Sequence, residues 1–244
     1  MAYMNDSVIL RPLRRVDFPV IAEMIRRMWY AEPELSLSCA RRLAMIDLHY
    51  SLSGSTSAMV AQCGDTVVGI ITTHVDAHTN PRVDTYADTH DNSHKSRVCS
   101  RFFSWHNRAI FRLTVSLLPS VQGRNGLRKM LSLGRIDANL MRSAQSHNDN
   151  GNSFDGEVVL FLVDETMRGR GVGRMLFDHA MQDFRLSGVN RYFLFTDTRC
   201  NVGFYNHRGL TRLCSQRTAL YGDSEQTFYL YEGQASVHPT PARA

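Results

Sequence analysis

The sequence predicts an α/β (α+β) protein, in which strands and helices share one domain. The main observation is an apolar strand at 157–163 followed by a glycine-rich turn and a helical pattern over about 172–187. A second observation is a pair of β-rich runs joined by Gly64-Asp65, a dipeptide typical of two-residue hairpins. A third is an opening strand at 8–13 that precedes apolar residues at helical spacing.

Composition indicates an ordinary soluble globular protein, with 43% hydrophobic and 21% charged residues among 244. We expect no membrane span, because no apolar run approaches the roughly 18 residues required, and the start lacks the order of a signal peptide. Five cysteines without a CxxC pair favour free thiols and a cytoplasmic location. The net charge of +5 favours anionic partners.

The first 75 residues suggest a strand, two helices and a hairpin. Asp17 is expected to cap the first helix and Ser38 the second, with Gly54 just beyond the end of the second helix. After the central strand, Gly188 is expected to stop the long helix and Gly209 to end a short one. The remaining strands are expected at 191–196 and near "LTRLCSQRTAL" and "TFYLYE".

Residues 76–156 interrupt this order and are interpreted as an insertion, because neither flank looks complete alone. The segment begins with a polar, loop-like stretch over 76–96, and "VCSRFFSWHNRAIFRLTVSLL" has mixed helical and strand character. A basic amphipathic helix is expected over 126–144, before a polar linker. We therefore predict a single domain over 1–232 with this insertion, and a disordered tail over 233–244.

The glycine-rich turn, Arg168-Gly-Arg-Gly-Val-Gly173, has the features of a phosphate-binding loop. A P-loop requires a lysine and a hydroxyl after the last glycine, and a Rossmann fingerprint requires G-x-G-x-x-G; neither spacing is present. The remaining pattern, [QR]-x-x-G-x-[GA] between strand and helix, lets successive N–H groups face one anion at the helix N-terminus. A plain glycine-rich turn with solvated arginines is the alternative.

Four segments of the chain, taken in sequence order, resemble the GNAT superfamily of acyl-CoA-dependent N-acyltransferases. The family resemblance rests on an opening strand and helix, a hairpin, a coenzyme A motif and a closing motif, which are "VILRPLRRVDFPVIAEMI", "GDTVVGII", "VVLFLVDETMRGRGVGRMLFDHAM" and "NVGFYNHRGL". It covers most of the chain, but residues 76–156 match no segment of the family. The resemblance implies a mixed central sheet of about six to seven strands flanked by helices, with a large insertion before the central strand.

The resemblance also implies roles for particular residues in an N-acetyltransferase reaction. Glu157 corresponds to the glutamate that some members use as general base, and Tyr205 to the tyrosine that protonates the coenzyme A sulfur. Asn201 and the backbone of Leu162 and Val163 correspond to contacts with pantetheine. The pyrophosphate site would comprise Arg168, Gly169, Arg170, Gly171, Val172, Gly173 and Arg174. Acetyl-CoA is then the co-substrate, and no metal is expected.

The remaining histidine, aspartate and cysteine residues give little indication of a functional site. A metal site at Asp88, His90, Asp91 and His94 is disfavoured, because no tetrahedral Cys/His spacing appears. His179 and His207 are interpreted as surface helix residues. Cys200 is not expected to be a nucleophile, because the sequence places no evident base beside it.

The insertion is strongly basic, with ten Lys and Arg residues between Asp91 and Ser146, and three interpretations of it stay open. It could form a lid over the acceptor pocket, with an apolar wall made by Phe102, Phe103, Trp105 and Phe111. It could instead form a homodimer contact. Contact with nucleic acid or an anionic membrane is the least favoured of the three.

Two functions are compatible with the whole sequence. The first is transfer of an acetyl group from acetyl-CoA to a primary amine, by direct attack in a ternary complex. The acceptor is a small molecule or a peptide, and its identity is left open. The second is a non-catalytic module that binds acyl-CoA for regulation. The presence of both Glu157 and Tyr205 favours the enzyme.

Overall fold

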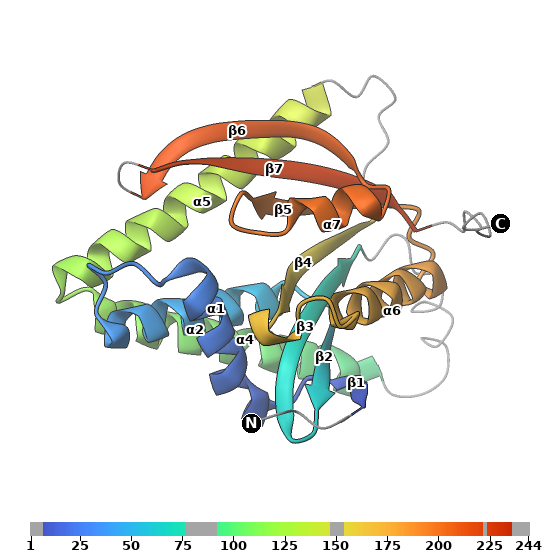
Figure 1. Cartoon of the computed structure of the whole chain (residues 1–244). Helices are drawn as coiled ribbons and strands as arrows, with labels where there is room; N and C mark the ends of the chain where they lie inside the picture. The colour runs from blue at the N-terminus through green and yellow to red at the C-terminus, as the bar shows by residue number, and fades with distance from the viewer. Residues whose placement is uncertain (1–6, 77–91, 147–153, 222–223, 236–244) are drawn as a thin grey trace.

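The computed structural model describes residues 7–76, 92–146, 154–221 and 224–235. A seven-stranded mixed sheet runs in the order β1-β2-β3-β4-β5-β7-β6, with helices on both faces (Figure 1). The strands are β1 (Val8–Pro12), β2 (Ser57–Cys63), β3 (Thr66–Val75), β4 (Gly156–Val163), β5 (Arg191–Asp197), β6 (Thr211–Tyr221) and β7 (Ser224–Gln234). The α-helices are α1 (Phe18–Trp29), α2 (Leu37–Ser53), α4 (Asn92–Leu117), α5 (Val121–Ser146), α6 (Val172–Leu186) and α7 (Val202–His207). The predicted α/β class and its sheet are confirmed.

The sheet divides between its two central strands. β4 and β5 are parallel, and their pairing covers two residue pairs, Gly156 with Tyr192 and Glu157 with Phe193. After these pairs the strands diverge, so the β5-facing edge of β4 has no strand partner among the described residues. Figure 1 shows the two halves of the sheet separating at this point. The divergence leaves room for ligands in the middle of the fold.

The N-terminal elements correct two of the predicted caps. Asp17 makes no capping bond to α1, because its carboxylate accepts hydrogen bonds from the Arg11 guanidinium at 2.8 Å and the Arg14 N–H at 2.7 Å. Ser36 is the N-cap residue of α2, so Ser38 lies inside the first turn. Gly54 ends α2 and Gly64-Asp65 joins β2 to β3, both as predicted.

Residues 76–155 connect two strands that are neighbours in the sheet, since β3 pairs antiparallel with β4. The predicted insertion before the central strand is therefore confirmed. Its polar loop is shorter than predicted, because α4 already begins at Asn92, and the stretch of mixed character is helical up to Leu117. The basic amphipathic helix is α5. None of the described helices is long and apolar enough to cross a membrane.

The two inserted helices cover different parts of the molecule. α4 packs against α2, with Leu113 and Leu117 in the apolar cluster that α1 and α2 form on one face of the sheet. α5 crosses to the other half, where Ile136 and Leu140 pack on β7 residues Phe228 and Leu230. α5 therefore bridges the two halves of the divided sheet (Figure 1).

A β-bulge in the central strand sets the direction of Glu157. Thr72 pairs with Leu160 and Thr73 with Val158, so Val159 is an extra residue in β4. As a result Val158 packs on the α6 side, whereas Leu160 packs on the α1/α2 side. Without the bulge Glu157 would share a face with Phe161, which packs on the α6 side. With it, Glu157 faces the space beneath α5.

The chain end is described up to residue 235. β7 runs to Gln234, two residues past the predicted end of the domain, and Ala235 is buried. Residues 236–244, which form most of the predicted tail, lie outside the described residues. The extent of the domain and its tail remain predictions.

Candidate functional site

The glycine-rich turn between β4 and α6 has the backbone needed for an anion site. Gly169 and Gly171 both have φ of 78°, a left-handed conformation that strains other L residues. Gly171 is the N-cap residue of α6, so the first N–H groups of that helix lack intrahelical acceptors. Asp164 holds the start of the turn by accepting a hydrogen bond from the Thr166 N–H at 2.9 Å. Free amides and the positive end of the helix dipole face the same region.

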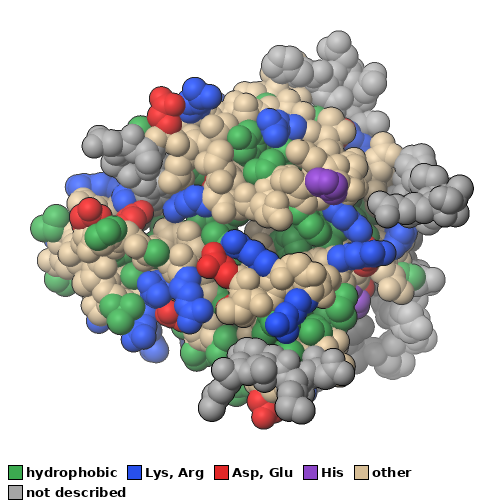
Figure 2. All heavy atoms as spheres, in the orientation of Figure 1, with side chains coloured by type: hydrophobic (Ala, Val, Ile, Leu, Met, Phe, Trp, Pro, Cys, Tyr) green, Lys and Arg blue, Asp and Glu red, His purple; other side chains and the backbone are tan. Residues whose placement is uncertain are grey.

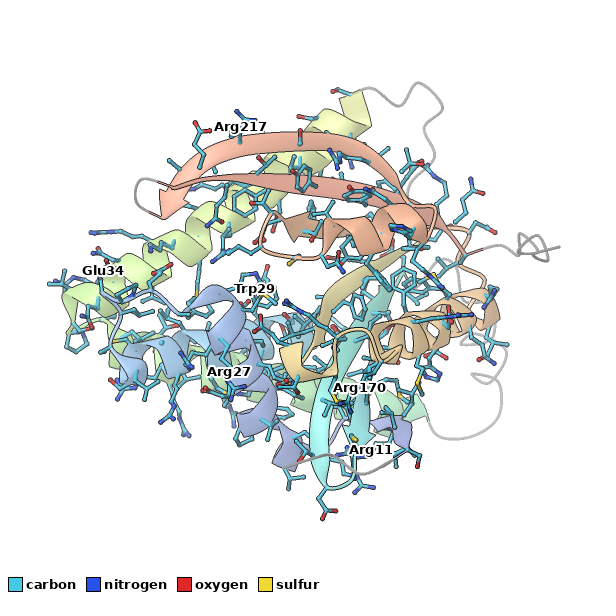
Figure 3. The ribbon with its side chains drawn as sticks, in the orientation of Figure 1. Arg11, Arg27, Trp29, Glu34, Arg170 and Arg217 are labelled. Atoms are coloured by element: carbon cyan, nitrogen blue, oxygen red, sulfur yellow. The ribbon has the colours of Figure 1, made fainter. Side chains whose placement is uncertain are left out.

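A cavity of about 380 Å³ lies over this turn and the open edge of β4. Its lining includes nearly all of the predicted cofactor residues, namely Leu162, Val163, Arg168, Gly169, Gly171, Val172, Gly173, Arg174 and Asn201. Arg170 is the exception: it is exposed on the turn and does not line the cavity (Figure 3). Arg168 and Arg174 are also exposed, and they pair with Glu165 at 3.0 Å and Asp178 at 3.4 Å.

The edge of β4 adds unpaired backbone groups to this cavity. Leu162 pairs with Ile70 and Val163 with Gly69 on the β3 side, and the opposite edge is open because β5 has diverged. An extended ligand can bind such an edge as an additional strand would. The cavity therefore combines a peptide-like edge with a phosphate-type loop, and this combination fits the pantetheine arm and pyrophosphate of coenzyme A.

A second and larger cavity, of about 1120 Å³, lies between the two halves of the sheet. Residues 157–161 of β4 and 194–197 of β5 form its floor, and α2 and α5 form its walls. Trp29, at the end of α1, also lines it (Figure 3). The space-filling view shows that this face is hollowed between the halves, with Lys and Arg side chains on either side (Figure 2).

The two cavities meet at three shared lining residues, Phe161, Cys200 and Tyr205. Tyr205 is 7% exposed, and burial raises the pKa of its hydroxyl, so the phenol stays protonated near neutral pH. Burial also raises the pKa of Cys200 to about 11, which keeps this residue a thiol. A protonated thiol is a weak nucleophile, in line with the prediction for Cys200.

Glu157 and Tyr205, the two predicted catalytic residues, line the same large cavity. Burial raises the pKa of Glu157, and His74 on the neighbouring strand partly offsets this effect. A carboxylate in such an environment is a stronger base than one in water. The structure thus brings together the two residues that the family resemblance singled out.

Three further carboxylates in this cavity were missed by sequence reasoning: Asp47, Asp137 and Asp197. Burial raises the pKa of Asp47 to about 6, although Tyr30 donates a hydrogen bond to it at 3.2 Å. Burial, together with the negative charges of Glu157, Asp47 and Asp197, raises the pKa of Asp137 to about 7. These residues come from separate elements, so no local spacing in the sequence indicated them.

The insertion does form a wall of the large cavity, but not with the predicted aromatics. Trp105 packs on Phe18 and His49 on the far side of α2, and Phe111 is 69% exposed. The wall consists of α5 residues such as Leu127, Met130 and Asp137. The side chains of Phe102 and Phe103 lie outside the described residues.

The metal site that the sequence disfavoured would involve residues 88–91 and His94, whose side chains lie outside the described residues. Elsewhere in the chain, the described His, Cys, Asp and Glu residues form no group that could hold a metal ion. His207 is exposed as predicted, whereas His179 is half-buried and lies 3.5 Å from Asp183.

Solved structures of acetyltransferases share the divided sheet and its flanking helices. The ribosomal-protein-S18-alanine N-acetyltransferase of Escherichia coli has a TM-score of 0.51 at 10% identity, covering 98% of this chain and 100% of its own. A mosquito arylalkylamine N-acetyltransferase-like protein, 5b, has a TM-score of 0.50 at 15% identity, covering 93% and 100%. At these identities the likeness shows the fold.

A family model matches part of the sequence. The model of the family described as "Acetyltransferase (GNAT) family" matches residues 118–210, which include α5, β4, the glycine-rich turn, α6, β5 and α7. The expectation that residues 76–156 match no segment of the family is therefore wrong from residue 118 onward. Residues 118–210 therefore match an acetyltransferase domain of the GNAT family, in agreement with the resemblance. No curated protein matches the sequence significantly.

Proposed function

We propose that this protein transfers an acetyl group from acetyl-CoA to a primary amine by direct attack in a ternary complex. One observation carries the proposal: a cofactor-type cavity and a carboxylate-lined cavity meet at Phe161, Cys200 and Tyr205. Two reactants held on either side of that junction would be positioned for reaction. Such positioning can contribute about 7–11 kcal/mol to lowering the barrier.

The smaller cavity is the proposed site of acetyl-CoA. The N–H groups of the glycine-rich turn, together with Arg168 and Arg174, would hold the pyrophosphate, and the backbone of Leu162 and Val163 would hold pantetheine. Asn201, exposed at the start of α7, would add a side-chain contact. When bound, acetyl-CoA supplies an acyl group activated as a thioester.

Glu157 is the proposed general base. A primary amine with a pKa near 10.4 is almost entirely protonated at neutral pH, so it must lose a proton before it can attack. The carboxylate of Glu157 faces the cavity in which the amine would lie, and its raised pKa strengthens it as a proton acceptor. General-base help of this kind typically contributes about 10²–10⁴-fold in rate.

Tyr205 is the proposed general acid. Tyr205 lines both cavities and its hydroxyl stays protonated, so it can donate a proton to the departing sulfur. The nitrogen of a protonated amine loses two protons in the reaction, and both have a destination. Glu157 accepts the first proton before attack and later releases it to solvent. The second proton, lost from the nitrogen of the tetrahedral intermediate, replaces the one that Tyr205 gives to the departing thiolate.

The alternative is a non-catalytic module that binds acyl-CoA. Thiol release from acetyl-CoA, measured across a panel of amines, separates the two functions. Release that depends on an amine supports the enzyme, and binding of coenzyme A without release from any amine supports the module.

A further inference from the structure

Four carboxylates from four different elements line the large cavity. They are Asp47 of α2, Asp137 of α5, Glu157 of β4 and Asp197 of β5. They lie close enough for three of them to raise the pKa of the fourth, Asp137. Like charges gathered in a half-buried space repel one another, and a cation bound among them would remove that cost.

The positive groups around the cavity leave part of this charge unbalanced. Arg199 lies 3.6 Å from Asp197, and His74 lies beside Glu157. By contrast, the carboxylates of Asp137 and Glu157 have no hydrogen-bond or ion-pair partner among the described residues. These two carboxylates are therefore available to a ligand.

Three arginines of α5 also line the cavity, but all three are exposed. The Arg124 guanidinium donates to the Leu118 carbonyl at 2.7 Å, and that of Arg128 donates to the Asn125 side chain at 3.2 Å. These contacts hold Arg124 and Arg128 in the first part of α5. Arg135, the third arginine, lies further along the same helix. The arginines consequently lie toward solvent, whereas Asp47 and Asp137 are half-buried.

Thr196 provides an independent sign of a ligand. It lines the cavity, is 8% exposed, and its hydroxyl makes no hydrogen bond of good geometry with a described residue, although Cys200 and Tyr205 lie nearby. A buried hydroxyl that makes no well-formed hydrogen bond is costly, so a bound hydrogen-bond donor would be stabilised there. An ammonium group is such a donor.

The wall between these polar groups is apolar. Leu127 and Met130 of α5 line the cavity together with Leu160 of β4 and Leu194 of β5. A chain of methylene groups would bury its surface against such a wall, whereas a strongly polar chain would lose its hydration there. The cavity therefore suits an aliphatic chain that carries more than one cationic group.

Resting on the proposed function, we infer that the acceptor is an aliphatic diamine or polyamine. One amine is acetylated beside Glu157, and a second ammonium is held by Asp137 and Asp47. The second ammonium supplies the positive charge that the cavity lacks, and the methylene chain between the two lies on the apolar wall.

The test compares α,ω-diaminoalkanes with n-alkylamines of the same carbon number, using wild-type protein and acetyl-CoA. We expect kcat/KM to be at least about tenfold higher for the diamine, because one additional charge-assisted contact is typically worth that much. Equal or better turnover of the n-alkylamines would overturn the inference and leave the proposed function standing. Absence of thiol release with every amine would instead remove the proposed function.

A variant locates the second ammonium. Asp137→Asn keeps the shape of the side chain and removes its charge, so the ratio of diamine to monoamine kcat/KM should fall about tenfold. Equilibrium dialysis of a diaminoalkane without acetyl-CoA should show a similar loss of affinity. Glu225→Gln, on the exposed side of the β6–β7 hairpin and outside the cavity, should leave the ratio unchanged. An unchanged ratio in Asp137→Asn would show that this carboxylate does not bind the acceptor.

Discussion

Asp137 of α5 and Glu157 of β4 face the same cavity, and the charge of Glu157 helps to raise the pKa of Asp137 to about 7. Asp137 belongs to the insertion, whereas Glu157 is the second residue of the central strand of the sheet. The insertion therefore contributes a carboxyl group to the cavity that the proposed base also lines. This relationship connects the insertion between β3 and β4 to the proposed chemistry of the site.

Replacing Glu157 by Gln should lower kcat/KM for acetyl transfer by roughly 10²–10⁴-fold, because the amine loses its proton acceptor. In the wild type, kcat/KM should rise with pH as Glu157 deprotonates, and the midpoint should lie above the ordinary glutamate value of about 4.3, since burial raises its pKa. Coenzyme A affinity should not change, because Glu157 does not line the smaller cavity. Unaltered turnover in the variant would exclude Glu157 as the base.

Replacing Tyr205 by Phe should lower kcat by roughly 10²-fold, the lower end of the usual range for proton transfer, because the departing sulfur loses its proton donor. Tyr229→Phe is the matched control, since it removes a phenolic hydroxyl that lies outside both cavities. Steady-state kinetics of both variants provide the measurement. Equal effects of the two substitutions would argue against a special role for Tyr205.

Gly171→Asp should abolish coenzyme A binding by placing a negative charge at the N-terminus of α6. The backbone strain of a side chain at φ of 78° can be separated from the charge by the Gly171→Asn variant, because Asn tolerates this conformation comparatively well. Calorimetry should show that the Asn variant retains more affinity than the Asp variant. Indistinguishable affinities would contradict the assignment of the turn to the pyrophosphate.

Asp137→Asn should stabilise the free protein at alkaline pH. The folded pKa of about 7 lies above the ordinary 3.8, so the stability that the protonated group contributes is present below pH 3.8 and is lost as pH rises through 7. At pH 8 the variant should therefore exceed wild type by roughly 1–3 kcal/mol in the free energy of unfolding, and at pH 3.8 the two should be similar. Urea unfolding at both values measures this, and a pH-independent difference would show that Asp137 is not strained by charge.

The parts of the fold and site that could be predicted are those encoded locally. The strand, turn and helix around Gly171 depend on residues adjacent in sequence, and the Gly64-Asp65 hairpin likewise carries its own turn chemistry. The acidic cluster was not predictable, because Asp47 and Asp137 meet only through the packing of α2, α5 and β4. The bulge at Val159, which turns Glu157 toward that cluster, left no sign in the apolar run 158–163.

The capping of the first helix illustrates the same limit. Asp17 stands where an N-cap residue is expected, yet its carboxylate binds Arg11 of β1. A nearby guanidinium competes successfully with the helix amides, since hydrogen bonds between charged groups are the stronger ones. Sequence position alone does not reveal such a competitor.

The most direct test of the central claim is thiol release from acetyl-CoA by the wild-type chain across a panel of amines, with Glu157→Gln measured in parallel. The account predicts amine-dependent thiol release, an acetylated amine detected in equal amount by mass spectrometry, and loss of most of this activity in the variant. Tight coenzyme A binding without thiol release from any amine would contradict it.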